Sequence, residues 1–214
     1  DTLARIQLIH KQAKLADKAG KPRSSLRWLT RALQLLEEAS EREASVHRAR
    51  LSATYSIVRA GQGRAKDAIS WAERAIAEAE AVEEREALAN AHYMIAWTRV
   101  NQGEFGQESH FERALSLFEE LGDVKRQGDV LTYFGAMAYW EGRWREAVEL
   151  YERGRERSER AGDAVGAAIA SMNIAEVRSD QGRLDEAEGP AREALRVFRA
   201  AAYAELIATD CSIL

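Results

Sequence analysis

The sequence predicts an all-α fold: a right-handed superhelical solenoid of about five helical hairpins, followed by a truncated final helix. Three observations predict it. The 214-residue chain is 46% hydrophobic and 31% charged with only two prolines, a mixture typical of helical proteins. Its residues lack the strict alternation of Val, Ile and Thr that predicts strands. A sequence motif centred on a glycine also recurs about every 40 residues, which is typical of a repeat architecture.

The repeat is marked by five glycines with small residues at fixed distances from them. The markers are Gly20, Gly63, Gly103, Gly142 and Gly182. Seven residues before them stand Ala13, Ser56, Ala96, Gly135 and Ala175. Twelve residues after them stand Ala32, Ala75, Gly154 and Ala194, while Ala114 takes this place in the Gly103 unit, which is one residue shorter. Since helices approach to about 8 Å only where the crossing side chains are small, these positions predict the contacts within each hairpin.

Each marker glycine is predicted to end a first helix and to turn the chain into a second one. The first helices are expected near 2–19, 43–60, 84–101, 124–140 and 163–180. The second helices are expected near 22–38, 64–81, 107–120, 143–160 and 183–199, with an eleventh helix starting near Ala202. Pro190 should kink the last second helix or delay its start. Asp67, Glu146 and Glu186 follow three of the glycines, where acids complement a helix N-terminus.

This pattern resembles the tetratricopeptide repeat. The small residues before and after the glycine and the aromatic at Phe111 or Tyr151 match that family, over essentially the whole chain. The units are longer than the usual period of about 34 residues and lack its closing proline. They are similar to the elongated repeats of bacterial signalling proteins and peptide-sensing regulators.

The domain prediction is a single array over residues 1–214. Its repeats are expected at 2–38, 43–81, 84–120, 124–160 and 163–199, with a partial repeat at 202–214. Natural arrays end in a polar cap over the last apolar face, and the chain ends in Ile213 and Leu214. We therefore expect a fragment of a longer multidomain protein, or a final helix that packs on a neighbouring molecule.

No motif predicts catalysis, a cofactor or a metal site. The histidines are His10, His47, His92 and His110, and no two are spaced as ligands on one helix face. His92 is interpreted mainly as a packing residue. Cys211, the one cysteine, has no histidine near it in sequence and is interpreted as an inert thiol. No phosphate-binding glycine loop or nucleophile elbow occurs, so we expect a protein that is not an enzyme.

The resemblance implies a binding groove lined by the first helices. The implied groove residues combine aromatic side chains with amides and acids, which suits an extended peptide. They are Asn90, Tyr93, Trp97, Asn101, Asp129, Thr132, Tyr139, Met172, Glu176 and Asp180. For Trp97 and Tyr139 the alternative is that the rings fill gaps between helices. The three acids indicate a ligand with a basic group.

The expected partner is therefore a protein or peptide. With 31 basic and 35 acidic residues interspersed, direct nucleic-acid binding is not expected. No apolar run approaches the ~20 residues of a membrane helix, and a single cysteine fits a reducing compartment, so we expect a cytoplasmic protein. The predicted function is a non-catalytic scaffold within a bacterial signalling or transcriptional regulator, linked to a cyclase or an ATPase. The alternative is self-association, with homo-oligomers forming through the array ends.

Overall fold

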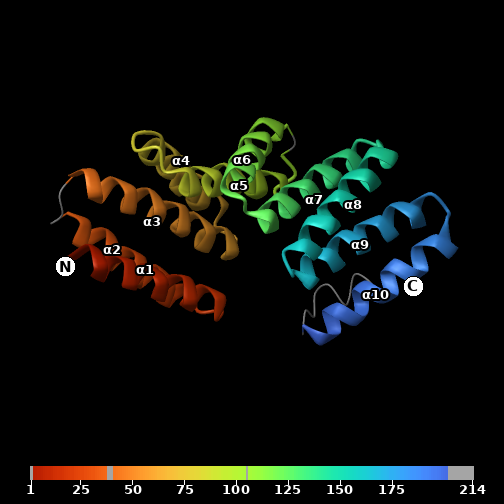
Figure 1. Ribbon diagram of the computed structural model, residues 1–214, viewed down its shortest axis with the longest axis horizontal. Helices are drawn as coiled ribbons and strands as arrows, with labels where there is room; N and C mark the ends of the chain where they lie inside the picture. Colours follow the sequence, from red (N-terminus) through yellow and green to blue (C-terminus); the bar gives the residue numbers. More distant parts are fainter. Residues whose placement is uncertain (1, 38–40, 105, 202–214) are drawn as a thin grey trace. The chain divides into compact units, whose positions relative to one another are not determined.

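The all-helical prediction is confirmed in the computed structural model, which describes residues 2–37, 41–104 and 106–201. Ten helices and no strand occur in this part of the chain (Figure 1). The first helices are α1 (Thr2–Lys18), α3 (Glu41–Gly61), α5 (Arg85–Val100), α7 (Val124–Trp140) and α9 (Ala164–Asp180). The second helices are α2 (Pro22–Leu36), α4 (Ala65–Glu80), α6 (Glu108–Leu121), α8 (Trp144–Arg160) and α10 (Leu184–Ala200). The predicted eleventh helix and Cys211 lie outside the described residues.

The turn within each hairpin depends on the marker glycine, as predicted. All five marker glycines have positive φ, between 68° at Gly20 and 79° at Gly103. A residue with a side chain adopts this left-handed conformation only at a cost, whereas glycine adopts it freely. Backbone bonds close the turns: in the Gly142 turn, the amide of Gly142 donates to the carbonyl of Tyr139 and that of Arg143 donates to Ala138. The first helix therefore ends where the sequence says that it should.

The two kinds of helix begin differently. Glu84, Asp123 and Asp163 stand before α5, α7 and α9, and each carboxylate accepts a backbone N–H from the first turn of its helix, as N-cap acids do. The second helices α4, α8 and α10 instead start after an arginine that makes no side-chain cap. That arginine forms an ion pair with the acid three residues later, for example Arg64 with Asp67 at 2.9 Å. In these three repeats the arginine and the acid that follow the marker glycine therefore form an ion pair at the start of the second helix. This ion pair adds to the predicted interaction of the acid with the helix dipole.

Pro190 lies inside α10, and the predicted delay of the helix start is wrong. The helix begins at Leu184, two residues after its marker glycine, as α4 and α8 do. A proline in a helix lacks the N–H that would bond to the carbonyl four residues earlier, here that of Glu186. The guanidinium of Arg178 donates to this carbonyl at 3.1 Å. A side chain from α9 thus replaces the missing backbone donor, which makes the proline tolerable.

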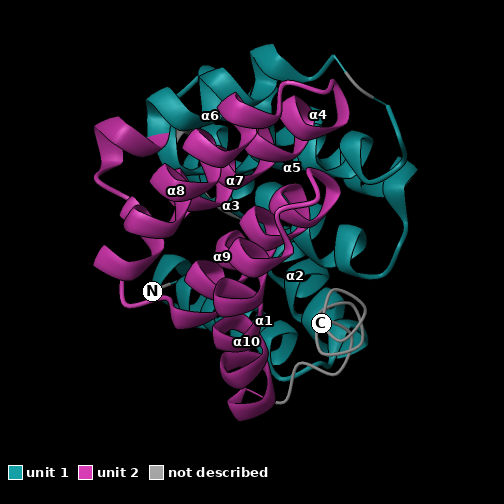
Figure 2. Cartoon of the chain, turned by 90° about the vertical axis from the view of Figure 1, so that its right-hand side faces the viewer, with its two compact units in different colours: residues 1–117 teal, residues 118–214 magenta. Residues whose placement is uncertain are grey.

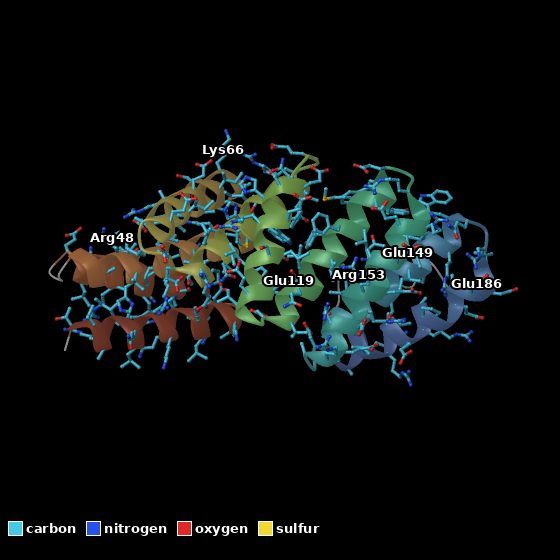
Figure 3. All side chains as sticks on the ribbon, turned by 45° about the horizontal axis from the view of Figure 1, so that its top comes forward. Arg48, Lys66, Glu119, Glu149, Arg153 and Glu186 are labelled. Carbon is cyan, nitrogen blue, oxygen red and sulfur yellow. The ribbon has the colours of Figure 1, made fainter. Side chains whose placement is uncertain are left out.

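The chain divides within α6 into two compact units, residues 1–117 and 118–214 (Figure 2). In unit 1, the hairpins α1–α2 and α3–α4 share a core that contains Ile6, Leu29 and Leu51, with α4 and α3 packing in turn on α5. In unit 2, the core of α7, α8 and α9 centres on Tyr151 and Ile174, and Phe198 of α10 packs against Met172 of α9. Charged side chains such as Lys66 on α4 and Glu186 on α10 extend away from the helices (Figure 3). No helix within the described ranges is long and apolar enough to cross a membrane.

Candidate binding surface on the first helices

The predicted groove residues lie on α5 in unit 1 and on α7 and α9 in unit 2. Asn90 on α5 is partly exposed, and Asn101 at the C-terminal cap of α5 is exposed. Each donates its amide N–H to the backbone carbonyl four residues earlier, at 2.8 and 2.7 Å. A side-chain amide bonded in this way still offers its oxygen as an acceptor. Trp97, the residue whose carbonyl accepts from Asn101, is itself half-buried. These three side chains form the accessible part of the α5 set.

Tyr93 of α5 lies in the hairpin core. Its side chain is buried, and its ring meets that of Phe111 on α6 edge-on, with the centroids 6.1 Å apart. Met172 on α9 has a similar position, because it is buried against Ala168 and Phe198. Both residues hold a first helix on a second helix. Tyr93 and Met172 therefore support the first helices from within the core and do not form part of an exposed ligand surface.

On α7, Thr132 and Asp129 are partly buried near the contact with α8. The hydroxyl of Thr132 donates to the carbonyl of Gly128 at 3.0 Å. Asp129 forms an ion pair with Arg126 at 3.3 Å. Burial raises the pKa of the Asp129 carboxyl, and the nearby charge of Arg126 opposes that shift. The carboxylate of Asp129 is thus already compensated by a cation from its own helix.

Tyr139, Glu176 and Asp180 come together on neighbouring first helices of unit 2. The hydroxyl of Tyr139 on α7 donates to the carboxylate of Asp180 on α9. Glu176 is one helical turn before Asp180 and so lies on the same face. The hydrogen bond to Asp180 raises the pKa of Tyr139, and burial together with the negative charge of Asp180 raises that of Glu176. Of the ten predicted residues, these three are the ones that form a connected polar surface.

Beneath this polar surface, Tyr151 of α8 supports α7. The ring of Tyr151 is buried, and a Cβ placed on Gly135 would lie 2.6 Å from its Cδ1 atom. Gly135 is therefore needed because the ring occupies the space that any side chain would take. Burial and the charge of Glu176 raise the pKa of the Tyr151 phenol. Sequence reasoning found the small residue at position 135 but did not connect it with Tyr151.

A pair of histidines was also missed. Nδ1 of His92 on α5 lies 2.9 Å from Nδ1 of His110 on α6, and their ring centroids are 5.1 Å apart. One imidazole must donate and the other accept, so the two rings cannot both be protonated. Burial lowers the pKa of His92 to about 4, with further contributions from His110 and Arg113. The residues lie on different helices, so a search for ligand spacing on one helix could not find the pair. No three His, Cys, Asp or Glu side chains within the described ranges could hold a metal ion.

Helical hairpins with this turn and contact pattern define a helical-repeat protein. Residues 126–200 match the family model described as Tetratricopeptide repeat. The resemblance to tetratricopeptide repeats that the glycine and alanine register predicted is thus confirmed over residues 126–200. No curated protein sequence matches the chain.

Three solved structures illustrate the likeness of the fold. BtubC from P. vanneervenii is 20% identical, with a TM-score of 0.74 over 94% of this chain and 82% of its own. A signal transduction ATPase with a tetratricopeptide repeat sensor, from Pyrococcus horikoshii, is 12% identical, with a TM-score of 0.75 over 96% of this chain and 31% of its own. A Rap protein complexed with competence and sporulation factor is 16% identical, with a TM-score of 0.69 over 99% of this chain and 63% of its own. This chain therefore spans less than two thirds of the last two proteins.

Proposed function

We propose that the chain is a non-catalytic scaffold that binds a protein or an extended peptide on its first helices, as a module of a bacterial signalling or transcriptional regulator in the cytoplasm. The observation that carries the proposal is the polar surface of Tyr139, Glu176 and Asp180. The Tyr139 phenol and the Asp180 carboxylate are held together by a hydrogen bond, and the buried Tyr151 of α8 supports α7 beneath them. A preorganised surface of this kind loses little entropy when a ligand binds.

The chemistry of this surface favours a ligand with a basic group. Glu176 and Asp180 are exposed carboxylates, and the negative charge of Asp180 lies close enough to disfavour the charge of Glu176. An ammonium or guanidinium group would relieve that repulsion and would form charge-assisted hydrogen bonds with both acids. Tyr139 would then contribute ring area. In unit 1, taken by itself, the Asn90 and Asn101 amide oxygens could accept N–H groups of an extended backbone.

The wider role rests on the fold comparisons. One similar structure is a signal transduction ATPase with a tetratricopeptide repeat sensor, and another is a Rap protein complexed with competence and sporulation factor. In this chain, ligand binding would change the balance between two states of the array and so bias an attached domain, such as a cyclase or ATPase.

A peptide-display selection on the 214-residue chain tests the proposal. Peptides selected on the wild-type chain should bind the double variant Trp97→Ala/Tyr139→Ala at least tenfold more weakly. Among them, peptides with Lys or Arg should also lose affinity for Glu176→Gln/Asp180→Asn, whereas peptides without a basic residue should not. Leu184→Ala is the matched control, because Leu184 is an exposed apolar residue on a second helix.

Circular dichroism of each variant separates loss of binding from loss of fold. If Trp97→Ala/Tyr139→Ala keeps its helical signal and binds the selected peptides as tightly as the wild type, the first-helix surface is not the binding site and the proposal is wrong.

A further inference from the structure

The outer face of α1 is exposed, although the repeat predicts that it should be buried. We define this face as Ala4, Leu8, Lys11, Leu15 and Lys18, which follow each other at alternating intervals of four and three residues. All five are exposed, and the side chains of Leu8 and Leu15 are 59% and 66% accessible. Residues at this spacing lie along one side of a helix. The face is separate from the polar surface of α7 and α9 described above.

The equivalent residues of the other four repeats are buried. Leu8 stands twelve residues before its marker glycine, and the residues at that position elsewhere are fully buried: Leu51, Ala91, Val130 and Ala170. Leu15 stands five residues before the glycine, and its equivalents are at most 3% exposed: Val58, Thr98, Met137 and Val177. In the other four repeats the residues at these two positions are covered by neighbouring residues. Among the described residues, nothing covers Leu8 and Leu15 of α1 in this way.

The other hairpins show what makes that contact. Leu51 and Val58 of α3 belong to one core with Leu29 and Leu36 of α2, the second helix of the preceding hairpin. Val177 of α9 belongs to one core with Tyr151 of α8, again the second helix of the preceding hairpin. Likewise α4 packs on α5. The element that fits on Leu8 and Leu15 is thus an amphipathic helix.

Charge identifies the kind of helix. Residues 2–36 contain eight Lys or Arg residues and a single acid, Asp17, whereas the whole chain has more acidic than basic residues. Lys11 and Lys18 lie on the outer face between and beyond the leucines, and Arg5 lies beside it. None of these three cations forms an ion pair within the described part of the chain. A helix with carboxylates beside its apolar stripe would pair with them, whereas a basic helix would be repelled.

We propose that the outer face of α1 binds an acidic amphipathic helix of a partner protein, in the place that a preceding second helix takes in the other repeats. The leucines supply the apolar contact, and the cations supply selectivity for acidic over basic helices. Nucleic acid fits less well, because apolar side chains occupy the centre of the face.

The chain itself offers a matched pair of probe peptides. Both α2 and α4 are second helices that pack on a following first helix. The α4 sequence, residues 65–80, has four acidic and two basic residues, whereas the α2 sequence, residues 22–36, has three arginines and no acid. We would label each peptide with fluorescein, stabilise it as a helix with a side-chain bridge on its polar face, and titrate it with the 214-residue chain.

The acidic α4 peptide should bind, and the basic α2 peptide should bind at least tenfold more weakly. Leu8→Glu/Leu15→Glu should weaken α4-peptide binding at least tenfold, and Lys11→Glu/Lys18→Glu at least fivefold, with less difference at high salt. Leu184→Glu, on an equally exposed leucine of α10, should change nothing. Because all these side chains are exposed, the variants should fold, and circular dichroism verifies this.

Three results would overturn the proposal. The first is that the α4 peptide does not bind, or binds as weakly as the α2 peptide. The second is a wild-type dimer that Leu8→Glu/Leu15→Glu separates into monomers, since a second copy would then cover the face. The third is binding to phosphatidylserine vesicles but not to phosphatidylcholine vesicles, lost in the same variant, since the face would then bind an anionic membrane. None of these results depends on Trp97 or Tyr139, so the proposed function is tested separately.

Discussion

The hairpins α3–α4 of unit 1 and α7–α8 of unit 2 have the same register but fill it differently. In α3–α4, Ser56 precedes the marker glycine by seven residues, and the rings of Tyr55 and Trp71 stack with centroids 4.1 Å apart. In α7–α8 the residue at the first position is Gly135, and the buried ring of Tyr151 takes the space above it. The repeat register therefore determines which positions of the two helices contact each other. The side-chain volume at such a contact can come from either helix, so a large residue on one helix goes with a small residue on the other.

The largest expected effect is that of Gly135→Ala. The new Cβ would lie 2.6 Å from the ring of Tyr151, and a buried ring cannot move aside as the end of a flexible side chain can. Overpacking of this kind costs about 2–3 kcal/mol of the free energy of unfolding. Gly61→Ala in α3 is the matched control, because its Cβ would meet nothing within 4 Å; it should stabilise the chain by about 0.5–1 kcal/mol. Urea denaturation measures both changes.

A double-mutant cycle identifies the cause of the Gly135 effect. In a Tyr151→Leu background, Gly135→Ala should cost much less, so the two substitutions should be coupled by more than about 1 kcal/mol. Additive effects would mean that the Tyr151 ring is not what excludes a side chain at position 135, and the comparison between the two hairpins would lose its basis.

The ten described helices also show how far sequence reasoning can go. The glycine register predicted every described helix to within about two residues at each end, because turn glycines and small contact residues are local requirements of the backbone. It did not predict that Tyr93 and Met172 would be buried, since groove and core positions alternate within one turn of a first helix. It also did not predict the pairing of Tyr139 with Asp180, because contacts between successive first helices depend on side-chain conformations that the register does not specify.

The second prediction compares an ion pair of each unit. In unit 1, Glu84 is buried and accepts hydrogen bonds from Nε and Nη2 of Arg50 at 2.9 and 2.8 Å, and its other oxygen caps α5 at Ala87. Arg50→Met would leave this carboxylate buried without its cation and should cost about 2 kcal/mol, a value reduced because Arg50 is partly exposed.

An exposed ion pair within one helix of unit 2 should matter little. Arg145 and Glu149 on α8 are 3.8 Å apart, with side chains 96% and 66% exposed. Arg145→Met should change the free energy of unfolding by less than about 0.5 kcal/mol. Equal costs for Arg50→Met and Arg145→Met in urea denaturation would show that burial of Glu84 does not determine the value of its ion pair.

The third prediction is a difference in pH response between the units. All four histidines are in unit 1. Burial lowers the pKa of both His10 and His92 to about 4, and Lys14 and Arg113 respectively contribute to these shifts. Nε2 of His10 also donates to Thr54 Oγ1, because the Thr54 hydroxyl itself donates to the carbonyl of Arg50. Burial therefore favours neutral imidazoles at His10 and His92 in the folded protein.

The sign of the effect follows from proton binding. Between pH 6.5 and about 4 the unfolded chain binds more protons at these histidines than the folded chain does, so unit 1 should lose stability as the pH falls through this range. In unit 2 burial raises the pKa of Asp129 and Glu176, so the folded form binds more protons there and gains stability at low pH. The two units should thus respond to acid in opposite directions.

Urea denaturation at pH 7 and pH 5 tests this difference, with unit 1 followed through Trp28, Trp71 and Trp97 in a Trp140→Phe/Trp144→Phe variant. Unit 1 should lose about 1 kcal/mol per histidine, after allowance for their partial exposure. His10→Gln/His92→Gln should remove most of this loss, because glutamine does not titrate, whereas Asp129→Asn in unit 2 should leave it intact. A loss that persists in the histidine variant would show that other groups cause it, and the buried neutral histidines would then not be what distinguishes unit 1.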